Sequence, residues 1–275
     1  MPASLLVLTD FFREANGALD YATTLASTLQ ARLVLLHVRR DSVLDPEMFT
    51  GELSNLSKES IALAMSSIAL DLPVPVVAEV GHGRVASAVA DAVTRHHPAL
   101  VVLGRSNYDD IPDNLIQTTA LELLRLVAYP LLVVPHTVSG LRPLRRVLFA
   151  VDGEPFSLGE HAGAVRQLLT AIDAEVTVLY VAPNAVQAEA EEATDQALDT
   201  VLRTGLTIDL PLVKARTLAD ASPARAILDV AQSTDFDLVV VVARPRSFFG
   251  NLFHRSITAE ILRRSTIPVL VLPAA

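Results

Sequence analysis

Residues 129–135 read Tyr-Pro-Leu-Leu-Val-Val-Pro, and residues 267–273 read Ile-Pro-Val-Leu-Val-Leu-Pro. These two stretches close a longer internal repeat, in which Gly83–Pro135 aligns without a gap to Ala221–Pro273. A repeated unit of this size predicts two similar domains rather than a solenoid of short repeats. Each candidate site can therefore be examined in two copies, and the copies can differ.

The start of each copy matches as well, because Leu5–Asp10 resembles Val147–Asp152. Between the copies, residues 136–145 contain Ser139, Gly140 and Pro143, which interrupt regular structure. We therefore expect a first domain over residues 1–138 and a second over residues 144–275.

Composition limits the class of protein. The chain has 275 residues, of which 51% are hydrophobic and 19% are charged, with no tryptophan. Such a chain can fill two cores with Leu, Val, Ala and Ile, as buried parallel strands require. The formal net charge of −9 argues against a nucleic-acid partner, because general nucleic-acid binding needs a broad basic face.

Targeting and redox signals are few. The chain has no cysteine, which excludes disulfides and thiolate metal sites. Its start lacks the basic-then-apolar pattern of a signal peptide, and its apolar runs are shorter than the ~18 residues of a membrane span. We expect a cytoplasmic protein that does not associate with a membrane.

Short aliphatic runs alternate with Ala- and Leu-rich segments of helical spacing. In the first copy we expect strands at 4–10, 32–38, 74–80, 99–104 and 131–134, and helices at 14–30, 52–70, 84–96 and 115–127. In the second copy we expect strands at 146–151, 175–181, 208–215, 237–242 and 269–272, and helices at 157–172, 186–204, 223–233 and 255–264. This alternation predicts an α/β fold in which each domain has a five-stranded, mainly parallel sheet with helices on both faces.

Ligands of such sheets bind outside the carboxyl ends of the strands, where the strand order reverses. The candidate site residues therefore follow strands one, two and four of each copy. In the first copy they are Thr9, Asp10, His37, Val38 and Gly104, and in the second Val151, Asp152, Tyr180, Val181 and Val242.

This constellation resembles the universal stress protein family in its tandem two-domain form. The resemblance rests on the first strands ending in Asp10 and Asp152, the second strands ending in His37-Val38 and Tyr180-Val181, and the proline-framed closing segments. It implies a non-catalytic stress-response protein that acts by binding a ligand or a partner. It also implies that the final strands of the two domains pair as an intramolecular pseudo-dimer, with further homo-oligomerisation left open.

Members of the family that bind ATP carry a glycine motif after strand four: Gly, two residues, Gly, nine residues, then Gly and Ser or Thr. Glycines let the backbone approach phosphate, and helix N-terminal amides supply an anion site. The resemblance implies that the aspartate after strand one and the backbone after strand two hold the adenine and the ribose.

Both copies depart from this motif. The first copy keeps one glycine and the hydroxyl, with Asn107 and Gln117 at the other glycine positions. The second copy keeps no glycine, and its Pro245 also removes an amide donor. We expect any adenine nucleotide, such as ATP, in the first domain. The candidate residues there are Thr9, Asp10, Val38, Gly104, Asn107, Gln117 and Thr118, and their second-domain counterparts are Asp152, Val181, Arg255 and Ser256.

Several alternatives stay open at the level of the sequence. The protein is either a partner-binding protein, an ATP-binding regulator that uses its first domain, or a slow nucleotide hydrolase. Asp10 and Asp152 either contact a ligand or cap the following helix. The loop 244–256, with Arg244, Arg246, His254 and Arg255 around three phenylalanines, either binds an anion, packs on its own domain or contacts a partner. His96-His97 either ends a helix or, less simply, binds a metal.

Overall fold

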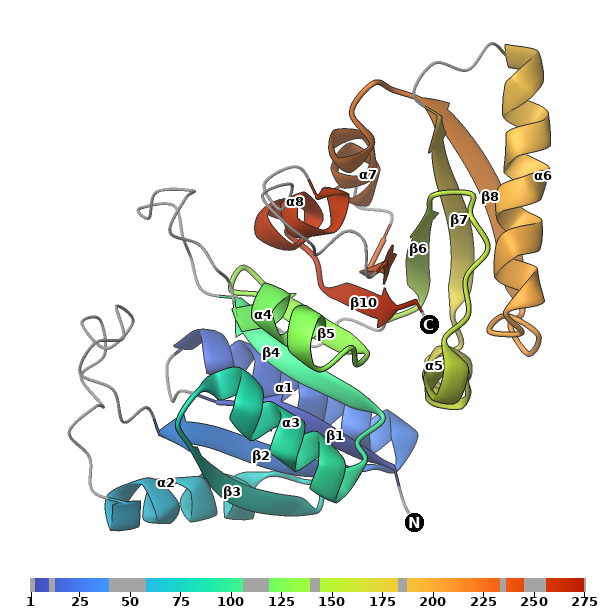
Figure 1. Ribbon diagram of the computed structural model, residues 1–275. Helices are drawn as coiled ribbons and strands as arrows, with labels where there is room; N and C mark the ends of the chain where they lie inside the picture. Colours follow the sequence, from blue (N-terminus) through green and yellow to red (C-terminus); the bar gives the residue numbers. More distant parts are fainter. Residues whose placement is uncertain are drawn as a thin grey trace.

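Ten strands form one continuous sheet in the computed structural model of the chain (Figure 1). The structure describes residues 3–9, 13–39, 58–105, 119–138, 144–182, 187–232, 236–244 and 256–274. The strand order is β3-β2-β1-β4-β5-β10-β9-β6-β7-β8. The first five strands in the chain therefore form one half of the sheet and the last five form the other.

The elements of the first half follow the expected order. Its strands are β1 (Ser4–Leu8), β2 (Arg32–Arg39), β3 (Val76–His82), β4 (Leu100–Arg105) and β5 (Leu131–Pro135), and its helices are α1 (Arg13–Leu29), α2 (Lys58–Asp71), α3 (Val85–His96) and α4 (Thr119–Leu126). All neighbouring strands within this half are parallel. β3 lies at the edge of the sheet, and Pro75, which precedes it, offers its carbonyl to the amide of Leu33.

The second half repeats this arrangement. Its strands are β6 (Arg146–Val151), β7 (Glu175–Ala182), β8 (Leu212–Ala219), β9 (Leu238–Ala243) and β10 (Val269–Pro273), and its helices are α5 (Ala162–Ala171), α6 (Gln187–Arg203), α7 (Pro223–Gln232) and α8 (Ile257–Arg264). A short 3-10 helix, Gly159–His161, precedes α5 and replaces the start of the helix expected at 157–172.

One strand was expected in the wrong place. The apolar residues of 208–215 predict a strand there, but β8 begins at Leu212. Residues 204–210 form turns instead: Gly205 adopts a φ of +72°, and the amide of Leu210 donates to the carbonyl of Thr207. The aliphatic side chain of Leu206 is buried beneath these turns, so a hydrophobic residue here indicates packing and not strand pairing.

Helices cover both faces of the sheet, as the alternation of strands and helices predicts. One core contains buried residues of α1, α2, α5 and α6 together with one face of the strands. The opposite core contains buried residues of α3, α4, α7 and α8 with the other face. Each core includes residues of both halves, so the two domains share continuous hydrophobic layers. No helix among the described residues has the length and hydrophobicity needed to cross a membrane.

The two halves meet through their final strands, as expected. β5 and β10 pair antiparallel, with Leu132 opposite Leu270 and Leu131 opposite Val271. Because Leu132 and Leu270 occupy the same position in the two copies, this register is self-complementary about a local twofold axis. All residues of both strands are buried.

Side chains that differ between the copies reinforce this junction. Arg105, the last residue of β4, donates from Nη1 to the carbonyl of Leu262 (2.6 Å) and from Nη2 to the carbonyl of Ser265 (2.7 Å). Its guanidinium thus caps the C-terminal end of α8, where carbonyl groups lack helical partners. The corresponding residue of the second copy is Ala243, which has no donor in its side chain. The first domain therefore caps a helix of the second, but the second domain does not cap α4 in the same way.

We predict that Arg105→Ala lowers the free energy of unfolding by about 1–3 kcal/mol, because it leaves two carbonyls of α8 without a charged donor. Denaturant unfolding of the full chain measures this. The control is Arg264→Ala, which removes an exposed pair with Glu260 on the same helix and should cost less than about 0.5 kcal/mol. Equal losses in the two variants would contradict the cap.

Candidate functional site

The expected ligand crevice of the first domain is the region at the carboxyl ends of β1 and β4. The chain runs from β1 outward to β2 and β3 and then returns to β4 on the other side of β1, so the strand order reverses between β1 and β4. In doubly wound sheets this is where ligands bind. Thr9 and Gly104, both predicted site residues, lie at this edge.

Thr9 is held by hydrogen bonds to β2. Its amide donates to the carbonyl of Leu36 (3.0 Å), and its carbonyl accepts from Nδ1 of His37 (2.9 Å). Because a carbonyl can only accept, Nδ1 of His37 carries a proton in this contact. The side chain of Thr9 is buried, so this residue shapes the crevice through its backbone.

The other predicted residues of the first domain divide into two groups. Val38 pairs with Gly81 in the sheet and packs its side chain against the core, so only its backbone is available to a ligand. Gly104 pairs with Val134, as Val242 of the second copy pairs with Leu272, which confirms that the two positions are equivalent. Asp10, Asn107, Gln117 and Thr118 lie outside the described residues.

The second-domain crevice, at the carboxyl ends of β6 and β9, contains an ion pair. Arg244 follows β9 directly and donates from Nε to Oδ2 of Asp152 (2.6 Å) and from Nη2 to Oδ1 (2.7 Å). The same guanidinium donates to the carbonyls of Glu154 (2.7 Å) and Pro155 (3.1 Å). Four hydrogen bonds thus fix Arg244, whose side chain is only 12% exposed, across the turn that follows β6.

The turn itself is shaped by Asp152 and Gly153. Oδ1 of Asp152 accepts from the amide of Glu154 (3.1 Å), and Gly153 has a φ of +77°, a conformation that favours glycine. A Cβ atom on Gly153 would lie 3.3 Å from the ring of Tyr180, the residue equivalent to His37. The guanidinium of Arg244 and the ring of Tyr180 therefore both lie against this turn.

The ion pair sets the charge state of Asp152. Partial burial by itself would raise the pKa of this carboxyl group. Hydrogen bonds from Arg244 and from the amide of Glu154, together with the positive charge of Arg244, outweigh burial and hold the pKa of Asp152 below its ordinary value. The carboxylate is therefore ionised and already neutralised by a cation from the same domain.

The remaining second-domain candidates have structural roles in the described part of the chain. Val181 is buried in the core. Ser256 is the N-cap of α8, and its hydroxyl accepts from the amide of Ala259 (3.4 Å). The helix start expected from the motif spacing is therefore present, although the glycines are not. Arg255 lies outside the described residues.

Of the three alternatives for the loop 244–256, the anion site is disfavoured at Arg244, because its donors are directed to Asp152 and to backbone carbonyls. The other cationic residues and the phenylalanines of the loop 244–256 lie outside the described residues. The pairing of Arg244 with Asp152 was not predicted. The sequence contained a signal for it, since a cation directly after strand four and an acid directly after strand one lie on adjacent strand ends.

The histidine pair has a structural explanation for one of its members. Nε2 of His96 lies 2.7 Å from Oε1 of Glu79, whose other oxygen accepts from Arg95. His97 ends α3 in the left-handed conformation. Within the described ranges, His, Cys, Asp and Glu side chains form no group that could hold a metal ion.

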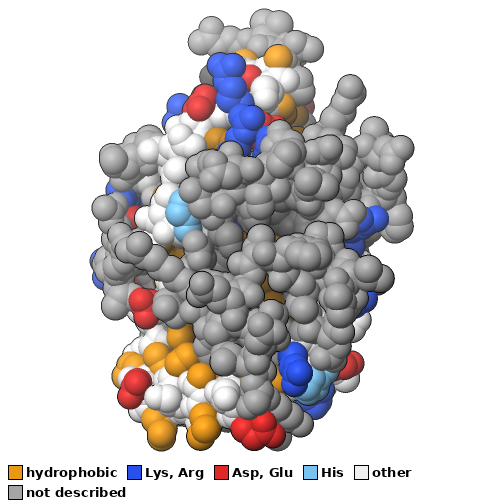
Figure 2. Space-filling view, turned by 90° about the vertical axis from the view of Figure 1, so that its left-hand side faces the viewer, with side chains coloured by type: hydrophobic (Ala, Val, Ile, Leu, Met, Phe, Trp, Pro, Cys, Tyr) orange, Lys and Arg blue, Asp and Glu red, His pale blue; other side chains and the backbone are white. Residues whose placement is uncertain are grey.

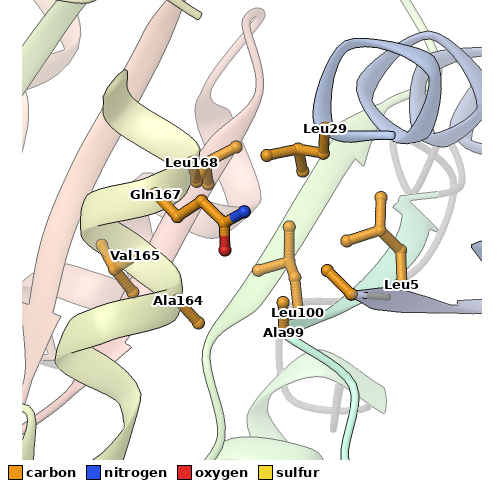
Figure 3. Close-up of a pocket in the computed structure, with 9 residues that line it drawn as sticks. Leu5, Leu29, Ala99, Leu100, Ala164, Val165, Gln167 and Leu168 are labelled. Carbon is orange, nitrogen blue, oxygen red and sulfur yellow. The ribbon is translucent and has the colours of Figure 1, made fainter. Parts of the chain in front are cut away.

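Two small cavities lie away from the crevices. The first is between α5 and the region where α1 ends and β1 and β4 begin (Figure 3), and Leu5, Leu29 and Leu100 line it together with Leu168. The second is beneath α4. Each leaves about 10 Å³ for the centre of a water-sized sphere, room for one water molecule at most, so neither can hold a metabolite.

The fold and the two crevices define a tandem pair of doubly wound α/β domains. The model of the universal stress protein family matches the chain twice, over residues 1–135 and over residues 143–273. The chain therefore belongs to the universal stress protein family. The comparison with curated proteins gave no match.

Solved structures of the same fold span nearly the whole chain. A universal stress protein from Archaeoglobus fulgidus is 16% identical, with a TM-score of 0.72 and 99% of each chain covered. A functionally unknown protein from Pseudomonas aeruginosa is 18% identical (TM-score 0.57; 98% of this chain and 92% of that chain). The cytoplasmic domain of a prokaryotic cation chloride cotransporter is 16% identical (TM-score 0.54; 98% and 95%). At these identities the likeness shows the fold alone.

We predict that Arg244→Ser lowers the free energy of unfolding by about 1 kcal/mol at pH 7, because the pair is strong in geometry but partly exposed. A carboxyl group whose folded pKa is depressed stabilises the fold above its unfolded pKa near ~4, and this contribution is lost as the pH falls through the folded pKa. The difference in the free energy of unfolding between the wild type and Arg244→Ser should therefore become smaller below about pH 4.

The control for this measurement is the same substitution in an Asp152→Asn, Glu154→Gln background, because Oε2 of Glu154 also lies 3.8 Å from Nε of Arg244. There both carboxyl groups that pair with Arg244 are absent, so the effect of Arg244→Ser should not depend on pH over that range. A pH-dependent loss that persists without Asp152 would assign the effect to another group.

Proposed function

We propose that this universal stress protein acts in the stress response by binding, without catalysis, and that its ligand is an adenine nucleotide held by the first domain. Family membership supports the stress-response role. The choice of domain rests on the difference between the two crevices.

The Asp152–Arg244 pair is the observation that carries this choice. In the second domain, any ligand that used Asp152 would have to displace a guanidinium fixed by four hydrogen bonds. Breaking a bidentate, charge-assisted pair opposes binding, because the ligand must replace its energy before it contributes affinity. The first copy has Ser106 at the position equivalent to Arg244, and so it lacks a cation there.

The described part of the first crevice supports ligand binding through the backbone. Gly104 has no side chain at the end of β4, whereas the second copy has Val242 there. The hydrogen bond from His37 holds the carbonyl of Thr9 in place at the end of β1. We propose that Asp10 and Thr118 complete this site, with the backbone at Val38 and the loop positions Asn107 and Gln117 lining it.

Support for a non-catalytic role comes from how polar groups at the strand ends are used. Both carboxylate oxygens of Asp152 accept hydrogen bonds from Arg244. A general base must be within reach of the proton that it takes up, and this carboxylate is already held in a structural ion pair. The competing hypothesis is a slow nucleotide hydrolase that uses the first domain.

We predict that the full chain binds ATP or AMP with at most one site per chain, and that Asp10→Ala weakens binding by about tenfold or more, as loss of one hydrogen-bonded carboxylate would. Asp152→Ala is the matched control, and it should leave the affinity unchanged. Isothermal titration calorimetry gives both the affinity and the stoichiometry. A larger loss in Asp152→Ala would move the site to the second domain.

A second variant tests the role of Gly104. Gly104→Val installs the residue that the second copy has at the same position of its strand, so the sheet should tolerate it. We expect this variant to fold and to lose nucleotide binding, because the side chain blocks close approach of phosphate.

Phosphate release measured with the wild type and with Thr118→Ala separates binding from hydrolysis. Turnover above that of the variant would favour the enzyme.

A further inference from the structure

The outer face of α2 is apolar and exposed. Leu63 is 72% exposed and Leu70 is 85% exposed. They lie seven residues apart, which places them on the same face of the helix two turns from each other. The opposite face of α2, with Ile61 and Met65, is buried in the core, so the two leucines are not needed for the fold of their own domain.

Residues between these leucines suit close contact with another helix. Ser66 and Ser67 lie midway between Leu63 and Leu70, and both are exposed. Small side chains flanked by leucines at this spacing form a seam into which a facing helix can pack. The seam is symmetrical about its centre, because a leucine lies three residues before Ser66 and another three residues after Ser67.

The seam is also uncharged, and this points to a second copy of the chain as the partner. Residues 60–70 contain no charged side chain. The equivalent helix α6 instead exposes Glu192, Asp195 and Asp199. In an interface between identical copies, residues near the twofold axis meet their own kind, so like charges there repel. An uncharged, symmetrical seam meets that requirement, and the acidic face of α6 does not.

Neighbouring structure extends this surface. Hydrophobic side chains gather at the lower end of the molecule in Figure 2, the end at which α2 and β3 lie in Figure 1. β3 is the edge strand beside α2, and Ala78 is exposed on the face of the strand whose Val76 and Val80 pack with α2. The opposite edge strand, β8, exposes Lys214 and Arg216, which are residues that protect a sheet edge from pairing. The edge strand beside α2 thus exposes apolar side chains and the edge strand beside α6 exposes charged ones, which is the same contrast as between the exposed faces of the two helices.

We propose that the outer face of α2 is a dimer interface at which two copies of the chain pack their α2 helices antiparallel about a twofold axis near Ser66 and Ser67. In this arrangement Leu63 of each copy contacts Leu70 of the other. This proposal is independent of nucleotide binding, because α2 lies at the edge of the sheet and the crevice lies at its carboxyl end.

Analytical ultracentrifugation of the full chain is the first test. We expect a monomer–dimer equilibrium at micromolar chain concentrations. Leu63→Glu should weaken dimerisation by about tenfold or more, because it removes apolar burial and places two carboxylates near the axis. Leu202→Glu, at an exposed leucine of α6, is the matched control and should leave the dimer intact. Circular dichroism checks that both variants stay folded, as expected for exposed positions.

Ionic strength gives an independent signature. Each copy carries a formal net charge of −9, so two copies repel each other at long range. Added salt screens this repulsion without weakening an apolar seam, and the dimer should therefore tighten as salt rises. A dimer that dissociates in salt would indicate ion pairs and would overturn the proposed contact.

Cysteine cross-linking tests which residues of α2 lie at the interface. The chain has no cysteine of its own, so only the introduced thiols can form a disulfide. With Ser66→Cys or Ser67→Cys, mild oxidation should link two chains, because disulfides need Cβ atoms within about 4 Å. Gln196→Cys on α6 is the control and should stay unlinked. A monomer at all concentrations, a dimer insensitive to Leu63→Glu, or linkage only through position 196 would each overturn the proposal. So would native mass spectrometry that shows a different molecule bound to a monomer.

Discussion

The antiparallel pairing of β5 with β10 is the contact on which the rest of the structure depends. Each domain ends in a strand whose residues are all buried, and such a strand cannot remain an exposed edge without promoting aggregation. Pairing the two strands turns two five-stranded sheets into one sheet of ten. It also joins the hydrophobic layers on each face, because both cores contain residues of both halves. The register is self-complementary, with Leu132 opposite its own counterpart, Leu270.

This pairing also fixes where the two crevices lie. Strands within each domain are parallel, and the two domains are joined by an antiparallel pair. The carboxyl ends of the first-domain strands therefore lie beside the amino ends of the second-domain strands. The crevice of one domain therefore faces away from the crevice of the other. α8 runs between these two ends of the strands. Its N-cap, Ser256, lies on the side of the second crevice, and its C-terminal carbonyls accept hydrogen bonds from Arg105 at the end of β4.

How far the sequence predicts the structure depends on whether a feature repeats. The duplicated strands and the α/β order follow from hydrophobic patterns that occur twice, and the pairing of the final strands was implied by the family resemblance. The structure confirms all three. The predicted start of β8 was wrong because Ile208 and Leu210 continue the alternating spacing of the strand but precede its first paired residue, Leu212. The pair between Asp152 and Arg244 was missed because its partners are 92 residues apart and meet only when β6 and β9 lie side by side. Features found in one copy alone, such as Arg105, have no internal repeat to reveal them.

A partly buried carboxylate at the end of the first strand has to be compensated, and there are two ways to do this. A ligand can supply hydrogen bonds, or the domain can supply a cation of its own. The second domain takes the latter course, because the guanidinium of Arg244 satisfies both oxygens of Asp152 and links them to the carbonyls of the same turn. This pair stabilises the domain without a ligand, and it is the basis for proposing the nucleotide site in the first domain, since a neutralised carboxylate gains little from new donors. In a duplicated protein the two copies are free to divide these roles, because the shared sheet keeps the second domain in place whether or not it binds anything.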